Sequence, residues 1–220
     1  MKFIPMTDPL YDYLVAHGHN ADPILAELAK ETAALGPISM MQIAPEQGTL
    51  MSVLVRAIGA TSAIEIGTFT GYSALSVARA LGPKGKLLCC DISDEWTAIA
   101  RKYWQKAGVA DRIELKLAPA LDTLAALPAD HTFDFAFIDA DKVSYRGYYE
   151  ALLPRMRANG LIVFDNVLWM GQVLDRAAPS DDTKALQALN DFIATDTRVQ
   201  AVMISVSDGL TIARKRAANE

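Results

Sequence analysis

Two apolar segments of strand length each end on a carboxylate. Residues 133–138 lead into Asp139, and residues 160–164 lead into Asp165 and Asn166. Runs rich in Ile, Val and Phe are typical of buried parallel strands, whose carboxyl ends form the ligand crevice of an open α/β sheet. Three oxygen ligands side by side suit a hard divalent cation. Asp139, Asp165 and Asn166 are therefore the candidate metal ligands, with Mg²⁺ favoured and Mn²⁺ or Ca²⁺ as alternatives.

A lysine follows the first of these strands. Lys142 lies three residues after Asp139, where it could accept a proton from a bound substrate. Each feature also has a plainer interpretation: strand-terminal aspartates form turns or cap helices, and Lys142 could be a surface ammonium paired with Asp141. Two carboxylate-ended strands, with an amide beside one and a lysine near the other, favour a functional site.

A glycine loop follows an earlier strand. Residues 65–73 read Glu-Ile-Gly-Thr-Phe-Thr-Gly-Tyr-Ser, and Gly67 and Gly71 would let the backbone turn sharply and approach a cofactor. The spacing matches neither the dinucleotide fingerprint nor a P-loop. Asp91, twenty residues past Gly71, ends the next strand and could accept hydrogen bonds from a ribose. The pattern predicts a nucleoside cofactor without pyrophosphate, such as S-adenosylmethionine, although glycines that only serve strand–helix packing are common.

The elements that position these residues alternate from residue 62 onward. The N-terminal part, residues 7–60, reads as helices, one opening at Asp22-Pro23 and one running from Pro45 to Gly59, with a loop or extended stretch at 36–43. The alternation predicts an α/β fold with one doubly wound, mostly parallel sheet. A terminal hairpin around Asp208-Gly209 would add an antiparallel edge strand. Strands are expected at 62–67, 86–91, 112–117, 133–139, 160–165, 199–205 and 209–214, and helices at 72–81, 94–107, 120–127, 145–157 and 183–195, with a loop at 170–182.

Composition narrows the class of protein. The chain has 220 residues, 51% of them hydrophobic, which fits a single domain spanning 1–220, with residues 1–60 as an N-terminal cap and 61–220 as the core. A net charge of −5 without a basic tract argues against nucleic acid as a partner. The sequence shows neither a secretory signal nor an apolar run of about 18 residues, so we expect no association with a membrane. Cys89 and Cys90 would point to opposite faces of a strand, which predicts free thiols and a cytoplasmic protein.

Taken together, these residues closely resemble the cation-dependent class I O-methyltransferases, a family that includes plant caffeoyl-coenzyme A and animal catechol O-methyltransferases. The resemblance runs from about residue 36 to the end. Its most specific parts are the glycine loop at 65–73, Asp-Ala-Asp-Lys at 139–142 and Asp-Asn-Val-Leu-Trp at 165–169. It implies a seven-stranded, Rossmann-like methyltransferase fold and a homodimer, with the N-terminal helices as the expected contact.

The resemblance also implies a role for each matching position. Lys142 matches the catalytic base, acting beside Asp139, and Lys142, Asn166 and Trp169 would contact the acceptor. The implied activity is transfer of a methyl group from S-adenosylmethionine to one hydroxyl of a catechol-type small molecule. The implied contacts to S-adenosylmethionine come from Met41, Ile43, Glu65, Gly67, Thr68, Ser73, Asp91, Ala120, Asp139 and Asp141.

Two other classes stay open on the sequence alone. One is a nicotinamide oxidoreductase, which the glycine spacing disfavours. The other is a non-catalytic methyltransferase-fold module, which intact metal ligands and Lys142 disfavour. The first 35 residues show no clear match to the coenzyme A-contacting region of the plant enzymes, so a coenzyme A ester is not implied. The tyrosines at 145, 148 and 149 are expected to serve packing only.

Overall fold

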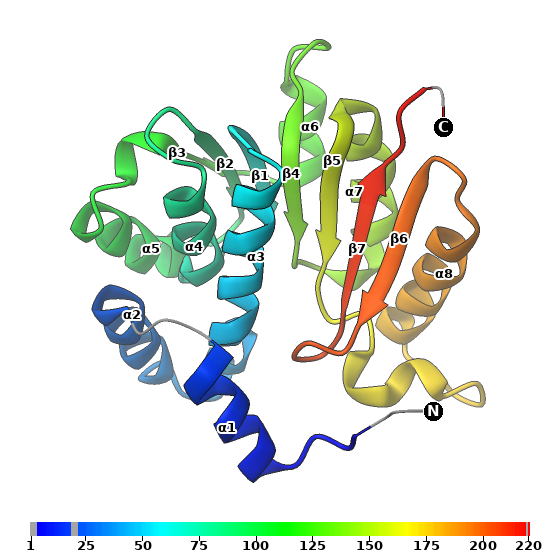
Figure 1. Cartoon of the computed structure of the whole chain (residues 1–220), viewed down its shortest axis with the longest axis horizontal. Helices are drawn as coiled ribbons and strands as arrows, with labels where there is room; N and C mark the ends of the chain where they lie inside the picture. The colour runs from blue at the N-terminus through cyan, green and yellow to red at the C-terminus, as the bar shows by residue number, and fades with distance from the viewer. Residues whose placement is uncertain (1–3, 19–21, 219) are drawn as a thin grey trace.

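The computed structural model describes residues 4–18, 22–218 and 220, and its centre is one seven-stranded sheet (Figure 1). The strand order is β3-β2-β1-β4-β5-β7-β6, with β1 to β5 parallel to one another. The doubly wound, mostly parallel fold expected from the sequence is confirmed. The strands are β1 (Ser62–Ile66), β2 (Lys86–Asp91), β3 (Ile113–Leu117), β4 (Phe133–Ile138), β5 (Met156–Phe164), β6 (Val199–Ile204) and β7 (Leu210–Lys215).

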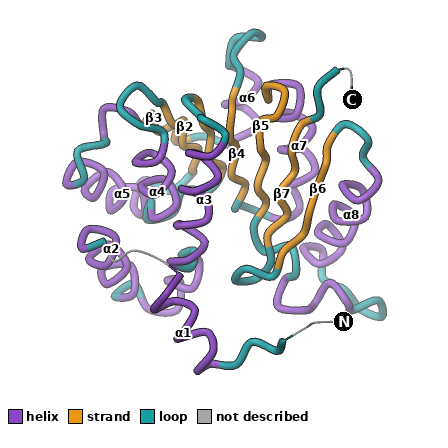
Figure 2. The backbone as a smooth tube through the Cα atoms, viewed as in Figure 1, coloured by secondary structure: helices purple, strands orange, loops and turns teal. Residues whose placement is uncertain are grey.

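Helices flank the sheet, and Figure 2 shows them as separate layers around the strands. None of the described helices is long and apolar enough to cross a membrane. The α-helices are α1 (Asp8–Gly18), α2 (Pro23–Ala33), α3 (Pro45–Ala57), α4 (Tyr72–Ala80), α5 (Asp94–Lys106), α6 (Ala120–Ala126), α7 (Tyr145–Leu152) and α8 (Asp181–Thr195). The 3₁₀ helices are η1 (Gly36–Met41), η2 (Ala110–Arg112), η3 (Lys142–Ser144), η4 (Leu153–Arg155) and η5 (Trp169–Leu174).

Two hydrophobic cores lie on opposite faces of the sheet. One joins the sheet to α3, α4 and α5 and contains Leu75, Cys89 and Phe137. The other joins it to α6, α7 and α8 and contains Cys90 and Ile138. Because strand residues alternate in direction, the two cysteines enter different cores, and both are buried and free.

The terminal hairpin is antiparallel, as expected from the sequence. Strand β7 is antiparallel to both β5 and β6 and lies between them, so the edge strand is β6. The predicted antiparallel edge strand is therefore confirmed. Burial explains the order: Leu210, Thr211 and Ala213 of β7 are buried, whereas most of β6 is exposed. The interior strand is the more buried of the two, although the edge strand β6 has the more apolar sequence.

Two other elements differ from the expectation. Residues 36–41 form η1 rather than a loop or extended stretch. The helix expected over 145–157 stops at Leu152, because Pro154 cannot continue it and a 3₁₀ turn follows. Strand β5 consequently begins at Met156, earlier than the sequence suggested.

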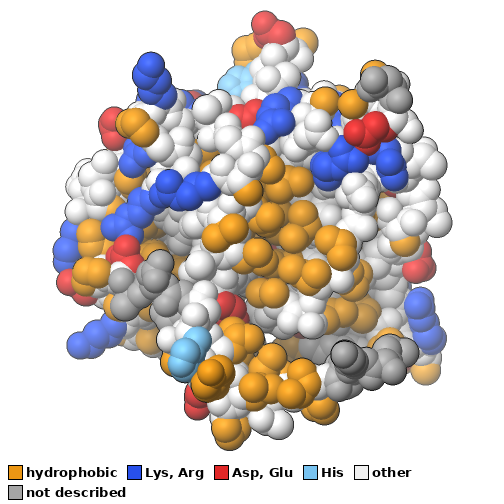
Figure 3. Space-filling model, in the orientation of Figure 1, with side chains coloured by type: hydrophobic (Ala, Val, Ile, Leu, Met, Phe, Trp, Pro, Cys, Tyr) orange, Lys and Arg blue, Asp and Glu red, His pale blue; other side chains and the backbone are white. Residues whose placement is uncertain are grey.

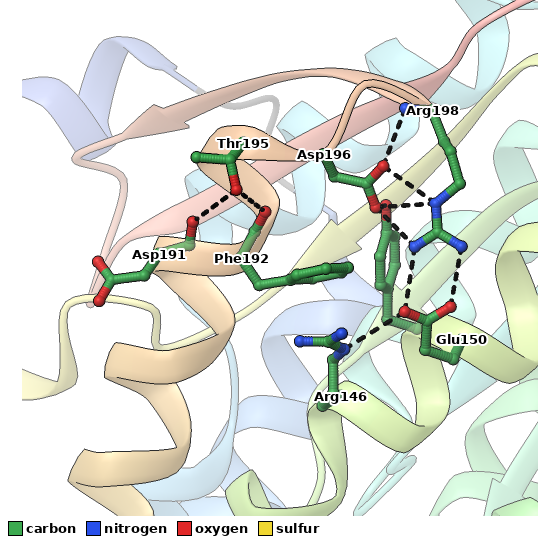
Figure 4. Close-up of polar contacts among 8 residues, drawn as sticks. Arg146, Glu150, Asp191, Phe192, Thr195, Asp196 and Arg198 are labelled. Atoms are coloured by element: carbon green, nitrogen blue, oxygen red, sulfur yellow. Dashed lines mark hydrogen bonds and ion pairs between the residues drawn. The ribbon is translucent and has the colours of Figure 1, made fainter.

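A polar network joins α7 to the end of α8 and the start of β6 (Figure 4). The Arg198 guanidinium lies 2.7 Å from an Asp196 carboxylate oxygen and 2.9 Å from one of Glu150. These bonds lower the pKa of Asp196 to about 2, with Arg198 as the main cause. Arg146 lies over the Phe192 ring, 3.2 Å from its centre. Every charge of this network is paired, so we assign it a role in joining the three elements.

Candidate active site

The two carboxylate-ended strands are neighbours in the sheet. Strands β4 and β5 pair in register from Phe135 with Leu161 to Ile138 with Phe164. The pairing extends one step further, because the Asp165 amide donates to the carbonyl of Ile138 at 3.0 Å. Asp139 and Asp165 therefore leave the sheet side by side at its carboxyl edge, as expected from the sequence.

Lys142 lies at the centre of this edge. The 3₁₀ turn η3 directs its side chain back over the strand ends, where the residue is only 7% exposed. Its Nζ donates to Asp139 Oδ1 at 3.1 Å, to Asn166 Oδ1 at 2.7 Å and to the Tyr145 hydroxyl at 2.7 Å. The three protons of an ammonium thus have three acceptors. Lys142 is not a surface ammonium.

The negative charge at this edge exceeds the positive charge. Burial, together with the nearby Asp139, raises the pKa of Asp165 to about 7, and a bond from Gln47 acts in the opposite direction. Burial also raises the pKa of Asp139, although the Lys142 ammonium opposes the effect. Two carboxylates share one lysine, so a second positive charge would stabilise both in their ionised form.

The donor set fits a hard divalent cation. Asp139 Oδ1 and Asn166 Oδ1 both contact the same lysine nitrogen, so these two oxygens lie close together, with Asp165 preceding Asn166 in the chain. Asn166 has a φ of 56°, a left-handed conformation that asparagine tolerates better than most residues. Within the ranges that the structure describes, no group of three or more His, Cys, Asp or Glu side chains could hold a metal ion. The candidate set here differs in composition, because it combines two carboxylates with one amide.

The glycine loop packs against the same strand end. Gly67 has a φ of 87°, and a Cβ there would lie 1.9 Å from the carbonyl oxygen of Asp139. Only glycine fits this contact. The loop between β1 and α4 is therefore held directly beside the candidate cation ligands, which places the predicted cofactor site next to the predicted cation site.

Asp91 holds the glycine loop from its other side. One carboxylate oxygen accepts the backbone amides of Thr68 and Phe69, at 2.9 and 2.8 Å. The other oxygen accepts the amides of Ile92 and Ser93, at 2.7 and 2.8 Å. The sequence did not predict these four bonds. The contact of Asp91 with a ribose stays a prediction. The same carboxylate already holds the glycine loop in place.

Glu65 is a buried acid beneath the loop. It is 1% exposed, and neither of its carboxylate oxygens makes a hydrogen bond. Burial raises the pKa of Glu65 to about 8. The hydroxyls of Ser73 and Thr68 act to lower this pKa, but neither forms a hydrogen bond with the carboxylate. A buried carboxyl without a partner is costly, so this position suits contact with a ligand.

The other residues expected to contact the cofactor differ in exposure. Ile43, Thr68, Ser73 and Ala120 are buried, whereas Met41 at the end of η1 is 43% exposed. Asp141 is also exposed, and its carboxylate accepts a hydrogen bond from Tyr148 of α7 at 2.6 Å. Its expected contact with the cofactor amine stays a prediction.

Two polar residues at the site were missed by sequence reasoning. Tyr145 was expected only to pack, but its hydroxyl accepts from Lys142 and donates to the Asp165 carbonyl at 3.2 Å. Gln47 of α3 donates to Asp165 Oδ2 at 2.8 Å. The available signal was position, because Gln47 falls on the buried face of α3 with Met51 and Val55, where a polar side chain needs a partner.

A strained segment follows Asn166. Trp169, Met170 and Gly171 have φ values of 48°, 50° and 82°, all in the left-handed region. The half-buried Trp169 ring lies over Lys142, with 5.6 Å between Nζ and a ring centre. Non-glycine residues in this conformation are uncommon and mark functional sites more often than ordinary loops.

Comparison with known proteins identifies the family. A family model described as O-methyltransferase matches residues 16–216. This chain belongs to the O-methyltransferase family. It is 38% identical over 216 residues to "Probable caffeoyl-CoA O-methyltransferase 1" of Dictyostelium discoideum, covering 96% of this chain and 94% of that protein. It is 36% identical to "Catechol O-methyltransferase domain-containing protein 1" of Mus musculus, covering 96% and 81%.

A solved structure agrees with both relatives. The O-methyltransferase from Bacillus cereus, determined in complex with SAH, superimposes with a TM-score of 0.85 at 30% identity, over 93% of this chain and 96% of that one. The resemblance inferred from the sequence motifs is confirmed, and the chain is an enzyme of this family rather than a nicotinamide oxidoreductase or a non-catalytic module.

Proposed function

We propose that this O-methyltransferase moves a methyl group from S-adenosylmethionine to one hydroxyl of a catechol-type small molecule, with the help of a divalent cation. The observation that carries the proposal is the contact of Lys142 with Asp139 and Asn166, at the strand ends beside the glycine loop. The names of the relatives, which mention caffeoyl-CoA and catechol, and the SAH in the Bacillus structure support it.

S-adenosylmethionine would supply the methyl group and would bind along the glycine loop. Gly67 and Thr68 lie at the end of β1, directly against the Asp139 backbone. The unpartnered carboxyl of Glu65 and the buried hydroxyl of Thr68 are polar atoms that a bound ligand could satisfy. Met41 at the end of η1 and Ile43, two residues after it, would cover the cofactor. Contacts from Ser73, Asp91, Ala120 and Asp141 would complete the set.

A divalent cation, Mg²⁺ by preference, would be held by Asp139, Asp165 and Asn166, where it would lower the pKa of a bound hydroxyl and orient it. The excess of carboxylate charge at these strand ends supports that assignment. Two of these ligands, Asp139 and Asn166, supply the oxygens that now accept from Lys142. If those oxygens bound a cation, they would no longer accept from Lys142, and its amine could contact the acceptor instead.

Lys142, once it has lost one of its own three protons to solvent, would take the proton of the reacting hydroxyl. Its amine is held by the Tyr145 hydroxyl, which is itself tied to the backbone of β5 through the Asp165 carbonyl. The nitrogen is therefore fixed against a rigid strand rather than carried by a loop. A positioned base is effective only within hydrogen-bonding reach of the proton it accepts.

The surroundings of Lys142 suit an aromatic acceptor. The Trp169 ring lies beside the amine, and the same segment, η5, carries the exposed apolar side chains of Met170 and Leu174. The ring could pack flat on a planar aromatic molecule, while a second hydroxyl on that molecule would anchor it to the cation.

We further propose a single-domain, cytoplasmic homodimer. The two free buried thiols fit a reducing compartment. The face of the sheet over β5, β7 and β6 carries a broad apolar surface beside α3 (Figure 3). Val53 of α3 and Val202 of β6 are 56% and 53% exposed, and a second copy of this chain would cover them. We therefore expect the contact to lie on the sheet and α3, rather than on the N-terminal helices alone.

The activity is tested with a catechol and its monohydroxy analogue. Production of S-adenosylhomocysteine is measured after chelation with EDTA and after Mg²⁺ or Mn²⁺ is added back. We expect turnover of the catechol to stop and then recover, and turnover of the monophenol to be slight throughout, because it cannot chelate. Full activity in excess EDTA, or equal rates on the two acceptors, would contradict the proposal.

A further inference from the structure

Gln47 connects the N-terminal region of the chain to the candidate cation site. It belongs to α3, whereas its partner Asp165 follows β5, 118 residues later. The Nε2–Oδ2 distance is 2.8 Å, and the glutamine is fully buried. The other oxygen of Asp165 accepts the backbone amide of Asn166 at 2.7 Å. These are the two hydrogen bonds that orient this carboxylate.

The helix that carries Gln47 is held firmly against the core. Gly48 lets α3 approach α4 closely, because a Cβ there would lie 2.9 Å from the Ser76 hydroxyl and 3.1 Å from the Tyr72 ring. Ser52, one turn further, donates to the Ser76 carbonyl at 3.0 Å. Gln47 therefore reaches Asp165 from a fixed backbone, which limits how far the carboxylate can turn.

The remaining polar atom of Gln47 is unpaired. Its Oε1 is buried and makes no hydrogen bond, although a buried amide oxygen normally has a partner. Because Nε2 of the same amide contacts Asp165, Oε1 lies close to the candidate cation site and could accept from a donor that arrives with the cation, such as one of its bound waters. This second observation points to a ligand, because packing alone would favour an apolar side chain at a fully buried position.

We propose that Gln47 is a positioning residue for the cation site: its amide fixes the Asp165 carboxylate in the orientation that binds the cation. The inference rests on the proposed function, because it assumes that Asp165 is a cation ligand. Groups that orient metal ligands in this way commonly contribute 10–100-fold to metal affinity. Gln47 would do so from a different part of the chain than the ligands themselves.

The test is the affinity of the full-length protein for Mn²⁺ alone, followed through the spectrum of free Mn²⁺ by electron paramagnetic resonance. Gln47→Met preserves the length of the side chain and removes both polar groups. We expect its dissociation constant for Mn²⁺ to rise about 10–100-fold. Affinity for S-adenosylhomocysteine, measured without metal, should be unchanged, which separates a positioning role from general damage to the fold.

Gln105→Met is the matched control. Gln105 is exposed on α5, so the same substitution there should leave Mn²⁺ affinity at the wild-type value. If wild type itself does not bind Mn²⁺, the proposed cation dependence and this inference both fail. If wild type binds and Gln47→Met binds equally well, the inference alone fails.

A measurement on wild type covers the case in which Gln47→Met does not fold. The side-chain amide of Gln47, assigned by triple-resonance NMR, should shift when Mg²⁺ is added, together with the side-chain amide of Asn166. The side-chain amide of Gln105 should not move. A shift of Asn166 without one of Gln47 would overturn the inference.

Discussion

Lys142 is buried among three hydrogen-bond acceptors, and this position decides how its substitution should behave. Lys142→Met should slow the methyl-transfer step by about 10²–10⁴-fold, the usual contribution of a positioned base. Binding of S-adenosylmethionine should change little, because the glycine loop is anchored by Asp91 and not by Lys142. Single-turnover methylation of a catechol separates this step from product release.

Lys184→Met is a suitable control for that experiment. Lys184 pairs with Asp181 at the same i, i+3 spacing as Lys142 with Asp139, but its side chain is 59% exposed. The control should transfer methyl groups at the wild-type rate. A normal rate in Lys142→Met would leave the cation alone to activate the hydroxyl and would remove the lysine from the mechanism.

Glu65 predicts a pH dependence of stability in the ligand-free protein. Burial raises its folded-state pKa to about 8, above the ordinary value of 4.5. Between these two values the folded state keeps a proton that the unfolded state has lost, so this residue makes stability fall as pH rises from 4.5 to 8. Glu65→Gln should remove that decline and be the more stable form at pH 8, by up to several kcal/mol at about 1.4 kcal/mol per pKa unit.

Urea unfolding of wild type and Glu65→Gln at pH 5 and pH 8 measures this difference. The free energy of unfolding of the variant, relative to wild type, should rise between the two pH values. A difference that does not depend on pH would mean that Glu65 is ionised throughout, with its charge compensated inside the fold.

Among the elements, the β6–β7 turn holds the segment that carries Trp169. Asp208 Oδ1 accepts the Met170 amide at 2.6 Å, and the Asp208 carbonyl accepts the Leu168 amide at 3.0 Å. Gly209, with a φ of 86°, allows Leu168 to pack against the turn. The left-handed conformation of this segment is unfavourable by itself, so these bonds maintain it.

Asp208→Ala should therefore raise KM for the acceptor about tenfold, while the affinity for S-adenosylmethionine stays the same. Loss of one hydrogen bond to a charged group costs about 1.5–3 kcal/mol, which is enough for that change. Asp175→Ala is the control, since Asp175 accepts the amides of Ala177 and Ala178 in the same region but does not hold Met170. Steady-state kinetics of the two variants with one catechol would show equal KM values if the turn has no such role.

The sequence predicted the strands and their polar ends, because apolar runs and terminal carboxylates are local signals. Two apolar runs end at Asp139 and Asp165, and Lys142 follows the first run closely. Because the two runs form neighbouring parallel strands, the sheet itself brings these residues together. The bond from Gln47 could not be predicted in this way, because it depends on how α3 packs across the sheet. The same holds for the left-handed φ of Met170, whose amide is held by Asp208 of the β6–β7 turn, 38 residues away.

For the molecule as a whole, the open face of the sheet suggests how two copies meet. Val202 of β6 pairs with Ile212 of β7, which pairs with Val163 of β5, so the three side chains share one face. Val163 is fully buried and Ile212 is partly buried, so the exposed part of this face lies at β6, where Val202 is 53% exposed. The helices on that side pack toward β1 and β2, and Figure 1 shows α3 beside this face rather than over it. An apolar face of this kind on a protein of 220 residues is typical of an interface between subunits.

Val202→Glu should therefore convert the dimer to a monomer, because a carboxylate would have to be buried without a partner in an apolar contact. Met203→Glu provides a control from the next residue of the same strand: Met203 is 43% exposed but points to the opposite face, since it pairs with Thr211, which pairs with Phe164. Sedimentation velocity over a range of concentrations should give a dimer for wild type and Met203→Glu and a monomer for Val202→Glu. A monomeric wild type would exclude the dimer, and a dimeric Val202→Glu would place the interface elsewhere on the molecule.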